Sequence, residues 1–244
     1  MAGCGCPVCR SKDPHDNRYR ASVLICGDAG ERVLIDAGPE FRLQAVRAGL
    51  SRLDAVFITH AHADHIHGLD DVRPFTRGEP LPVWANAVAA EELRVRFAYA
   101  FDPPQQGGGV PKIKLMVVPP EGVRVGGLHL LPVPLRHGIL EILGYRIGTF
   151  AYLTDCSGIP DASFPLLAGV KTLVIDGLRK KPHPTHFSIS QAADAARSLG
   201  VREAWIMHLC HESFHTELEE YCGRLSSPDL TIRPAWDGLK LEIL

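Results

Sequence analysis

The stretch Thr59-His-Ala-His-Ala-Asp-His-Ile-His-Gly68 contains four histidines and one aspartate, and it comes directly after a short apolar run. His60 and His62 are two residues apart, so their rings can bind the same metal ion. Asp64 and His65 lie further along the stretch and can bind a second ion nearby. Imidazole nitrogen and carboxylate oxygen together suit zinc and similar divalent metals. We therefore expect a two-metal site here, in preference to a polar surface loop.

Four side chains cannot complete the coordination of two metal ions, so other parts of the chain must supply ligands. Three candidates follow predicted strands. His137 comes two residues after the strand at 130–135, Asp155 ends the run Ala151-Tyr-Leu-Thr-Asp155 and could bridge both ions, and His208 follows Trp205-Ile-Met207. Each could singly be a solvated or core residue. Their order after the histidine stretch favours metal binding.

The bulk composition describes an ordinary globular protein. With 244 residues, 45% hydrophobic and 22% charged, the chain fits one domain over 1–244 with a Cys-rich zinc loop at about 4–20. The net charge of -2 argues against coating nucleic acid or a membrane surface. We expect no signal peptide, and no apolar run is long enough to span a bilayer. We expect a cytoplasmic protein whose seven cysteines are thiols or metal ligands.

The pattern of apolar residues predicts an α/β fold in which two sheets pack face to face with helices outside. Strands are predicted at 22–26, 32–36, 55–58, 81–85, 113–118, 123–125, 128–135, 145–154, 172–176, 204–207, 230–232 and 239–243. Helices are predicted at 39–49, 87–96, 190–199 and 215–225. Residues 101–111 are rich in glycine and proline, and we expect them to form a mobile loop.

The histidine stretch, followed in order by a lone histidine, an aspartate after a strand and a late histidine, resembles the metallo-β-lactamase superfamily over nearly the whole chain. The resemblance implies an αββα sandwich. It also implies that one metal is bound by His60, His62 and His137, that the other is bound by Asp64, His65 and His208, and that Asp155 bridges them. In Leu34-Ile-Asp-Ala-Gly38, Asp36 matches the superfamily aspartate that orients a metal-bound histidine. A capping or turn aspartate is the alternative.

A second group of candidate metal ligands lies near the start of the chain. Cys4, Cys6 and Cys9 are one ligand short of a tetrahedral zinc site, and His211, three residues after His208, could complete it. A redox cluster or a surface His211 are the alternatives. This arrangement resembles the PhnP group of phosphodiesterases from the bacterial carbon–phosphorus lyase pathway, in which such a zinc ion is structural.

The same group implies a general acid. Its members have a histidine some twenty residues before the last metal histidine, and His186, in Pro184-Thr-His-Phe-Ser-Ile-Ser190, lies 22 residues before His208. A helix-capping or substrate-lining role is the alternative for His186. We expect His183 and His215 to be solvated.

The sequence departs from the group at its beginning. Members normally open with a β-strand and a Gly-Thr-Gly-type turn before the cysteines, whereas this sequence begins at the cysteines. We expect the usual first strand to be lacking here, either because the start is assigned too far downstream or because the strand has been lost. A lost strand would leave a sheet edge open.

The favoured hypothesis is hydrolysis of a small phosphodiester, including cyclic ribose phosphodiesters, by a hydroxide held between two zinc or manganese ions. His186 and Asp64 are the expected catalytic residues, with His186 protonating the leaving oxygen. Arg73 is a candidate phosphate contact, or else an ion-pair partner of Asp70 or Asp71. We expect a small phosphodiester or nucleotide-like partner, no long nucleic acid because there is no basic stripe, and no membrane. A homodimer is compatible with the sequence.

Three alternatives to this hypothesis stay open. One is a lactone or thioester hydrolase using the same metals. Another is the related branch of pyrroloquinoline-quinone biosynthesis, which shares the cysteine loop but has a degenerate metal cluster. A third is a metal- or nucleotide-binding protein without turnover.

Overall fold

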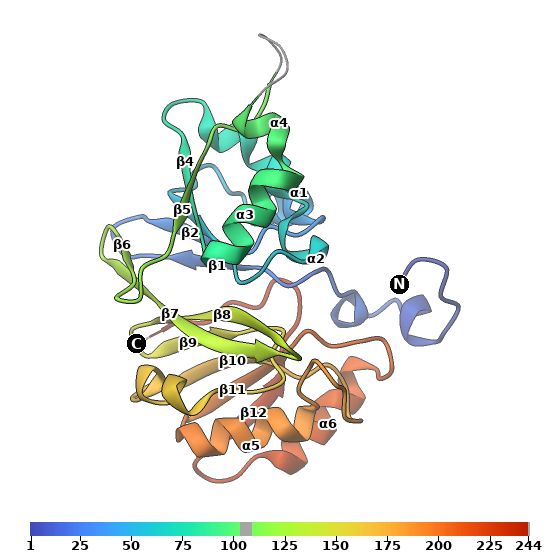
Figure 1. Cartoon of the computed structure of the whole chain (residues 1–244). Helices are drawn as coiled ribbons and strands as arrows, with labels where there is room; N and C mark the ends of the chain where they lie inside the picture. The colour runs from blue at the N-terminus through green and yellow to red at the C-terminus, as the bar shows by residue number, and fades with distance from the viewer. Residues whose placement is uncertain (103–108, 244) are drawn as a thin grey trace. The chain divides into compact units, whose positions relative to one another are not determined.

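The computed structural model describes residues 1–102 and 109–243, which divide into two compact units. We call Arg20–Pro132 the inner unit, and Met1–Tyr19 together with Val133–Leu244 the terminal unit. Figure 1 shows the course of the chain. The prediction of one domain stays a prediction. Residues 103–108, the middle of the loop expected at 101–111, lie outside the described residues.

The inner unit is built on a five-stranded sheet in the order β1-β2-β3-β4-β5, in which β1 is antiparallel to β2 and the other pairs are parallel. Its strands are β1 (Val23–Cys26), β2 (Arg32–Ile35), β3 (Ala55–Phe57), β4 (Leu81–Ala85) and β5 (Ile113–Val117). The short β6 (Val123–Val125) pairs with the start of β7 (Leu128–His137), which continues into the terminal unit.

Helices of the inner unit pack on this sheet through a single apolar cluster. They are α1 (Phe41–Arg47), α2 (Ala63–Ile66), α3 (Ala87–Arg96), α4 (Ala98–Phe101) and the 3-10 helix Leu69–Thr76. Phe41, Val56 and Leu93 are fully buried in the cluster. Burying side chains of this size stabilises the unit by roughly 1.5–3 kcal/mol each, which fixes the strand ends that carry the site.

The terminal unit is built on a sheet in the order β12-β11-β10-β9-β8-β7. Its other strands are β8 (Leu140–Ile147), β9 (Phe150–Leu153), β10 (Thr172–Asp176), β11 (Glu203–Met207) and β12 (Thr231–Pro234). Strands β9 to β12 are parallel to one another, and β8 is antiparallel to β9. The carboxyl ends of β9, β10, β11 and β12 therefore meet at one edge of the sheet.

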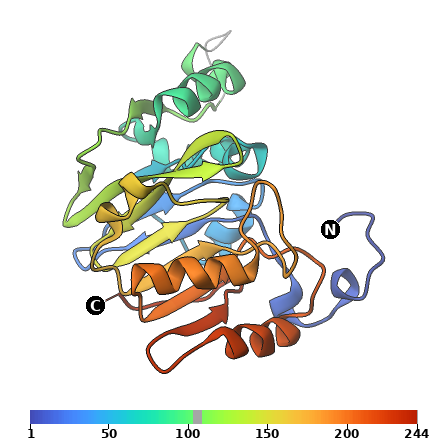
Figure 2. The same cartoon turned by 60° about the horizontal axis from the view of Figure 1, so that its bottom comes forward.

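Helices α5 (Ile189–Leu199) and α6 (His215–Leu225) pack against this sheet, as Figures 1 and 2 show. Helix α5 begins with a capping box between Ser188 and Gln191 and ends at Gly200, whose φ of 66° suits the left-handed C-terminal position. Its alanines Ala192, Ala193 and Ala196 are fully buried against the strands. Small side chains on this face let the helix lie close to the sheet. Short 3-10 helices occur at Val8–Arg10, Pro14–Asp16, Asp161–Ser163 and Pro165–Leu167.

Most predicted elements are present, but some predictions were wrong. The single strand expected at 145–154 is a hairpin of β8 and β9, because Gly148 takes a positive φ of 57° and turns the chain. The described residues at 239–243 form no strand. The histidine stretch contains the short helix α2, which its sequence did not predict. No helix among the described residues is long and apolar enough to cross a membrane.

Candidate active site

Three side chains of the candidate site occupy strained backbone positions just after strands. Asp36 follows β2, Asp155 follows β9 and His208 follows β11, with φ values of 62°, 54° and 57°. They are the non-glycine residues with positive φ among the described residues. Such angles are uncommon for L-residues and cluster at functional sites. The turn redirects each side chain at the point where its strand ends.

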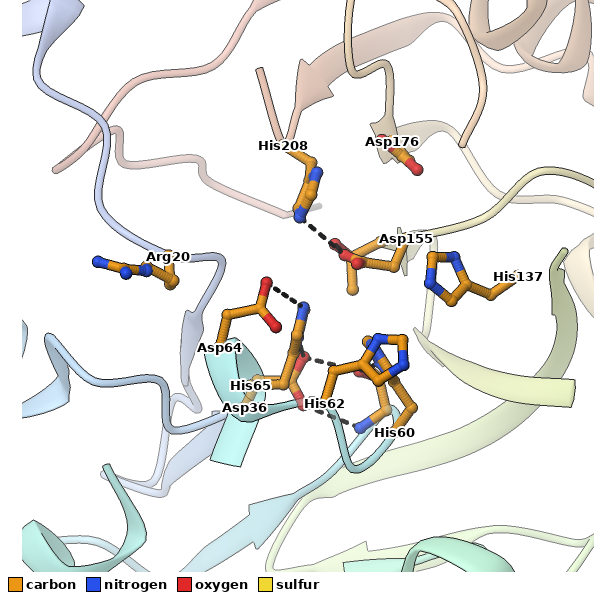
Figure 3. A network of polar contacts seen from close by, with 12 residues as sticks. Arg20, Asp36, His60, His62, Asp64, His65, His137, Asp155, Asp176 and His208 are labelled. Atoms are coloured by element: carbon orange, nitrogen blue, oxygen red, sulfur yellow. Dashed lines mark hydrogen bonds and ion pairs between the residues drawn. The ribbon is translucent and has the colours of Figure 1, made fainter. Parts of the chain in front are cut away.

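In the inner unit, the histidine stretch brings four potential metal ligands together. His60 Nε2 lies 2.9 Å from His62 Nδ1, and the ring centroids of His60 and His65 are 4.2 Å apart. Asp64 Oδ2 lies 3.7 Å from His65 Nε2, as the dashed line in Figure 3 shows. Two nitrogens bound to one tetrahedral zinc ion stand about 3.3 Å apart, given zinc–nitrogen bonds of about 2.0–2.1 Å. The distances between His60 Nε2 and His62 Nδ1 and between Asp64 Oδ2 and His65 Nε2 are close to this value, so each pair could bind one ion.

Asp36 orients His65 directly and His60 through Thr59. Its carboxylate accepts hydrogen bonds from the backbone N–H and the hydroxyl of Thr59, each at 2.8 Å, and from Nδ1–H of His65 at 2.7 Å. Because the Thr59 hydroxyl donates to Asp36, its oxygen accepts from His60 Nδ1 at 3.0 Å. Both Nδ1 atoms are thus occupied, which leaves Nε2 of His60 and of His65 as the nitrogens that could bind a metal. Burial raises the pKa of Asp36, and the His65 ring opposes that rise.

Close backbone contacts hold helix α2 against the loop after β2. The N–H of Ala37 donates to the carbonyl of His65, and the N–H of Gly68 donates to the carbonyl of Ala37, each at 2.8 Å. A Cβ atom on Gly68 would collide with the Gly38 carbonyl oxygen, and a Cβ atom on Gly38 would collide with the Asp64 carbonyl oxygen. Glycine at positions 38 and 68 therefore permits the close approach that brings His65 to Asp36.

In the terminal unit, the edge formed by the ends of the parallel strands carries the remaining predicted ligands. His208 Nε2 lies 3.3 Å from Asp155 Oδ1 (Figure 3). His137, the last residue of β7, has its Nδ1 2.8 Å from the carbonyl oxygen of Thr185. Since a carbonyl only accepts, Nδ1 carries the proton and Nε2 is the nitrogen that can bind a metal. Burial is the main cause that lowers the pKa of His137, which favours the neutral, metal-binding ring.

His186 lies in the same cluster of the terminal unit. Its ring centroid is 4.8 Å from that of His137 and 4.8 Å from that of His208, on which it stacks. His186 Nδ1 lies 2.7 Å from Oδ2 of Asp176, a fully buried carboxylate at the end of β10. His186 is therefore held by a buried acceptor among the predicted metal ligands.

The sequence analysis missed two residues that organise these side chains, Asp176 and Thr59. Asp176 closes Leu173-Val-Ile-Asp176 much as Asp36 closes Val33-Leu-Ile-Asp36. That shared pattern, an aspartate at the end of a buried strand, was a usable signal for Asp176. Thr59 had no comparable signal, since its role depends on the position of Asp36.

The predicted structural-zinc residues converge within the terminal unit. The sulfurs of Cys4, Cys6 and Cys9 and a ring nitrogen of His211 all lie within 4.8 Å of one another. His211 Nδ1 is 3.6 Å from Cys4 Sγ and 3.4 Å from Cys6 Sγ. A tetrahedral zinc ion with ordinary bond lengths places sulfur and nitrogen about 3.5 Å apart. The contact with His211 lowers the pKa of Cys6 to about 6, which favours the thiolate that binds metal.

Loop contacts hold the cysteine segment to the chain around His211. Arg18 donates to the carbonyl oxygens of Cys210 and Ser213, and the N–H of His215 donates to Asp16 at 2.7 Å. These contacts position the cysteines and His211 together. The four donors match zinc in number and chemical type.

Three other histidine and arginine predictions have different outcomes. Arg73 donates to the carbonyl of Gly109 at 2.8 Å, and Asp70 accepts from the Tyr99 hydroxyl at 2.7 Å, so the structure gives Arg73 a backbone partner. The prediction that His215 is solvated was wrong, because its side chain is 1% exposed and packs against His15 and Trp236. His183 is half-buried and lies beside His186, with 5.1 Å between ring centroids.

Comparison with known proteins identifies the family. Residues 31–209 match the model of the β-lactamase superfamily domain. The crystal structure of a diphosphatase from the PhnP family superposes with a TM-score of 0.88 and 42% identity, covering 100% of this chain and 92% of that one. Zinc-bound PqqB from Methylobacterium extorquens superposes with a TM-score of 0.73 and 18% identity, covering 99% and 95% of the two chains, a likeness of fold alone.

A relative in Porphyromonas gingivalis, named octanoyltransferase, is 41% identical over 243 residues, which are 99% of this chain. The chain spans about half, 48%, of that relative's length. The predicted fold class is confirmed: two sheets with helices, as in metallo-β-lactamase-fold proteins. The fold and the PhnP-family relative support a hydrolase with His and Asp clusters suited to divalent metals. The chain belongs to the β-lactamase superfamily and, within it, to the PhnP family.

Proposed function

We propose that the protein hydrolyses small phosphodiesters, including cyclic ribose phosphodiesters, with His186 as general acid. The observation that carries the proposal is the placement of His186 within the terminal unit. Its ring lies against His137 and His208, and its Nδ1 is bonded to the buried Asp176. A histidine placed in this way beside metal ligands is suited to proton transfer to a leaving oxygen.

The proposed metal ligands come from both units, and their combination rests on the family pattern. In this pattern His60, His62 and His137 bind one ion, Asp64, His65 and His208 bind the other, and Asp155 is shared. Zinc and manganese both suit mixed imidazole and carboxylate donors. When bound, two such ions would neutralise charge on the phosphoryl group and activate water at neutral pH. Cys4, Cys6, Cys9 and His211 would hold a third, structural zinc ion.

Asp176 and His186 of the terminal unit would direct the proton that is transferred to the leaving oxygen. Asp176 accepts the Nδ1–H of His186, so Nε2 is the nitrogen that carries the transferred proton. A buried carboxylate in this position fixes the ring and stabilises its protonated form, as the third member of a catalytic triad does. Loss of a general acid costs about 10²–10⁴-fold in rate.

The charge of the chain and its relatives support the proposed substrate class. A net charge of -2 and the lack of a basic stripe in the sequence favour a small, nucleotide-like substrate over long nucleic acid. The PhnP-family relative named a diphosphatase makes the phosphoanhydride of a diphosphate the second candidate bond. The octanoyltransferase relative gives a lactone or thioester less support, because this chain spans only 48% of that protein and the activity in its name belongs to the whole protein.

Steady-state hydrolysis by metal-loaded protein tests the proposal. The substrates are bis-p-nitrophenyl phosphate, a 2′,3′-cyclic nucleotide, a nucleoside diphosphate and a lactone. We expect phosphodiester turnover that His186→Ala lowers about 10²–10⁴-fold with metal content unchanged. His129→Ala, on β7 in the inner unit, serves as the matched histidine control. Turnover of the lactone alone, or of none of the four compounds, would contradict the proposal.

A further inference from the structure

The loop between β10 and α5 carries a second histidine whose placement the general-acid role does not explain. The base of this loop is closed by hydrogen bonds from Leu178 N to Phe187 O and from Ile189 N to Arg179 O, each at 3.0 Å. Arg179 also donates to the carbonyl of Pro182 at 3.1 Å. Pro182 and Pro184 flank His183 and restrict its backbone. The loop therefore presents His183 in a preorganised position.

Contacts with Thr185 fix the tautomer of His183. The backbone N–H of Thr185 lies 3.4 Å from His183 Nδ1, and the Thr185 hydroxyl lies 3.3 Å from the same nitrogen. A backbone N–H can only donate, so Nδ1 accepts and the proton of the neutral ring resides on Nε2. His183 is thereby a hydrogen-bond donor through Nε2.

The same threonine places this donor beside the general acid. The carbonyl of Thr185 accepts a hydrogen bond from His137, and the N–H of Thr185 donates one to His183. Thr185 therefore orients the rings of His137 and His183. The ring centroids of His183 and His186 are 5.1 Å apart. Both side chains are half-buried, and His183 lies between the exposed Pro182 and Pro184. His183 is therefore a partly exposed donor beside the proposed general acid.

We infer that His183 determines specificity for the leaving group, by donating its Nε2–H to a second oxygen next to the scissile bond. This inference rests on the proposed function. The ligand class is an oxygen-rich leaving group, in which the second oxygen belongs either to a phosphate or to a ribose. An aryl leaving group offers no such acceptor beside the bond that breaks.

The test compares kcat/KM for two oxygen-rich substrates, a nucleoside diphosphate and a 2′,3′-cyclic nucleotide, with that for bis-p-nitrophenyl phosphate. In His183→Ala we expect the ratio of oxygen-rich to aryl kcat/KM to fall about tenfold, the usual effect of one hydrogen bond. His183→Gln retains an N–H donor and should restore part of the ratio. Lys181→Ala, an exposed residue of the same loop, is the matched control.

The outcomes separate this inference from the proposed function. The oxygen-rich substrate whose ratio falls identifies the phosphate or the ribose as the partner of His183. In His183→Ala, a ratio within about twofold of wild type for both oxygen-rich substrates would overturn the inference. Equal losses of kcat/KM for all three compounds would overturn it as well. Neither result would contradict the proposed function. A wild-type protein without phosphoester turnover would remove both.

Discussion

His186 donates the hydrogen of Nδ1 to Oδ2 of Asp176 across 2.7 Å, and the carboxylate that receives it is fully buried at the end of β10. The pairing joins a loop residue to the rigid edge of a parallel sheet. A buried acceptor fixes both the rotation of the imidazole ring and the nitrogen that faces the substrate. Asp176 is therefore a positioning residue that acts through His186.

Replacing Asp176 by asparagine should lower kcat about 10–100-fold, because an amide can present an N–H to His186 and select the other tautomer. KM should change little, since Asp176 is buried away from the substrate. The measurements are kcat, KM and the pH profile, with metal content determined on the same samples. Asp161→Asn, an exposed aspartate of the terminal unit, is the control. A rise in KM with kcat unchanged would contradict the positioning role.

Asp36→Ala should destabilise the inner unit by about 3–5 kcal/mol, because the buried His65 and Thr59 lose their shared acceptor. Metal affinity should fall about 10–100-fold for the same reason. Urea unfolding and metal titration measure the two effects. Asp28→Ala, an exposed aspartate of the inner unit, should leave both within error. Normal metal affinity in Asp36→Ala would show that the histidines hold their orientation without it.

Glu31 should make the stability of the inner unit depend on pH in the acid range. Hydrogen bonds from the N–H groups of Gly127 and Ala29, at 2.7 and 3.1 Å, lower its pKa below 4.5, with the Gly127 bond as the largest cause. A carboxylate with a depressed folded-state pKa stabilises the fold above its unfolded pKa. That contribution is lost as the pH falls through the folded-state value.

The free energy of unfolding, measured between about pH 3 and 7, should therefore fall less steeply on acidification in Glu31→Gln than in the wild type. The two curves should converge at the acid end. Parallel curves would mean that the Glu31 carboxylate has no linked role.

Cys6→Ser should remove one tightly held zinc equivalent and lower the melting temperature, because Cys6 and His211 tie the N-terminal segment to the chain after β11. His211→Ala should do the same. Cys26→Ser, at an exposed cysteine, is the matched control. Elemental analysis after chelation, followed by thermal unfolding, gives both readouts. Unchanged zinc content in both variants would exclude the site.

The candidate metal ligands could be recognised in the sequence because their pattern is local. The spacing of His60, His62, Asp64 and His65 is visible without a structure, and the apolar runs before His137 and His208 mark strands. The hairpin at Gly148 was missed because the apolar residues on either side of it read as one strand. The role of Asp176 depends on the loop that returns His186 to β10, ten residues away in sequence. Contacts of that kind depend on tertiary packing, and a local pattern does not contain them.

Because the backbone at Asp155 and His208 is left-handed, the residue found at each position depends on whether stability or catalysis is selected. A non-glycine residue in this conformation costs of the order of 1 kcal/mol, which glycine would avoid. Directed evolution for heat resistance alone should therefore enrich glycine at both positions while discarding their side chains. Retention of aspartate and histidine there would show that catalysis was also under selection. Engineers who seek a sturdier enzyme should hold these two positions fixed and seek gains elsewhere in the chain.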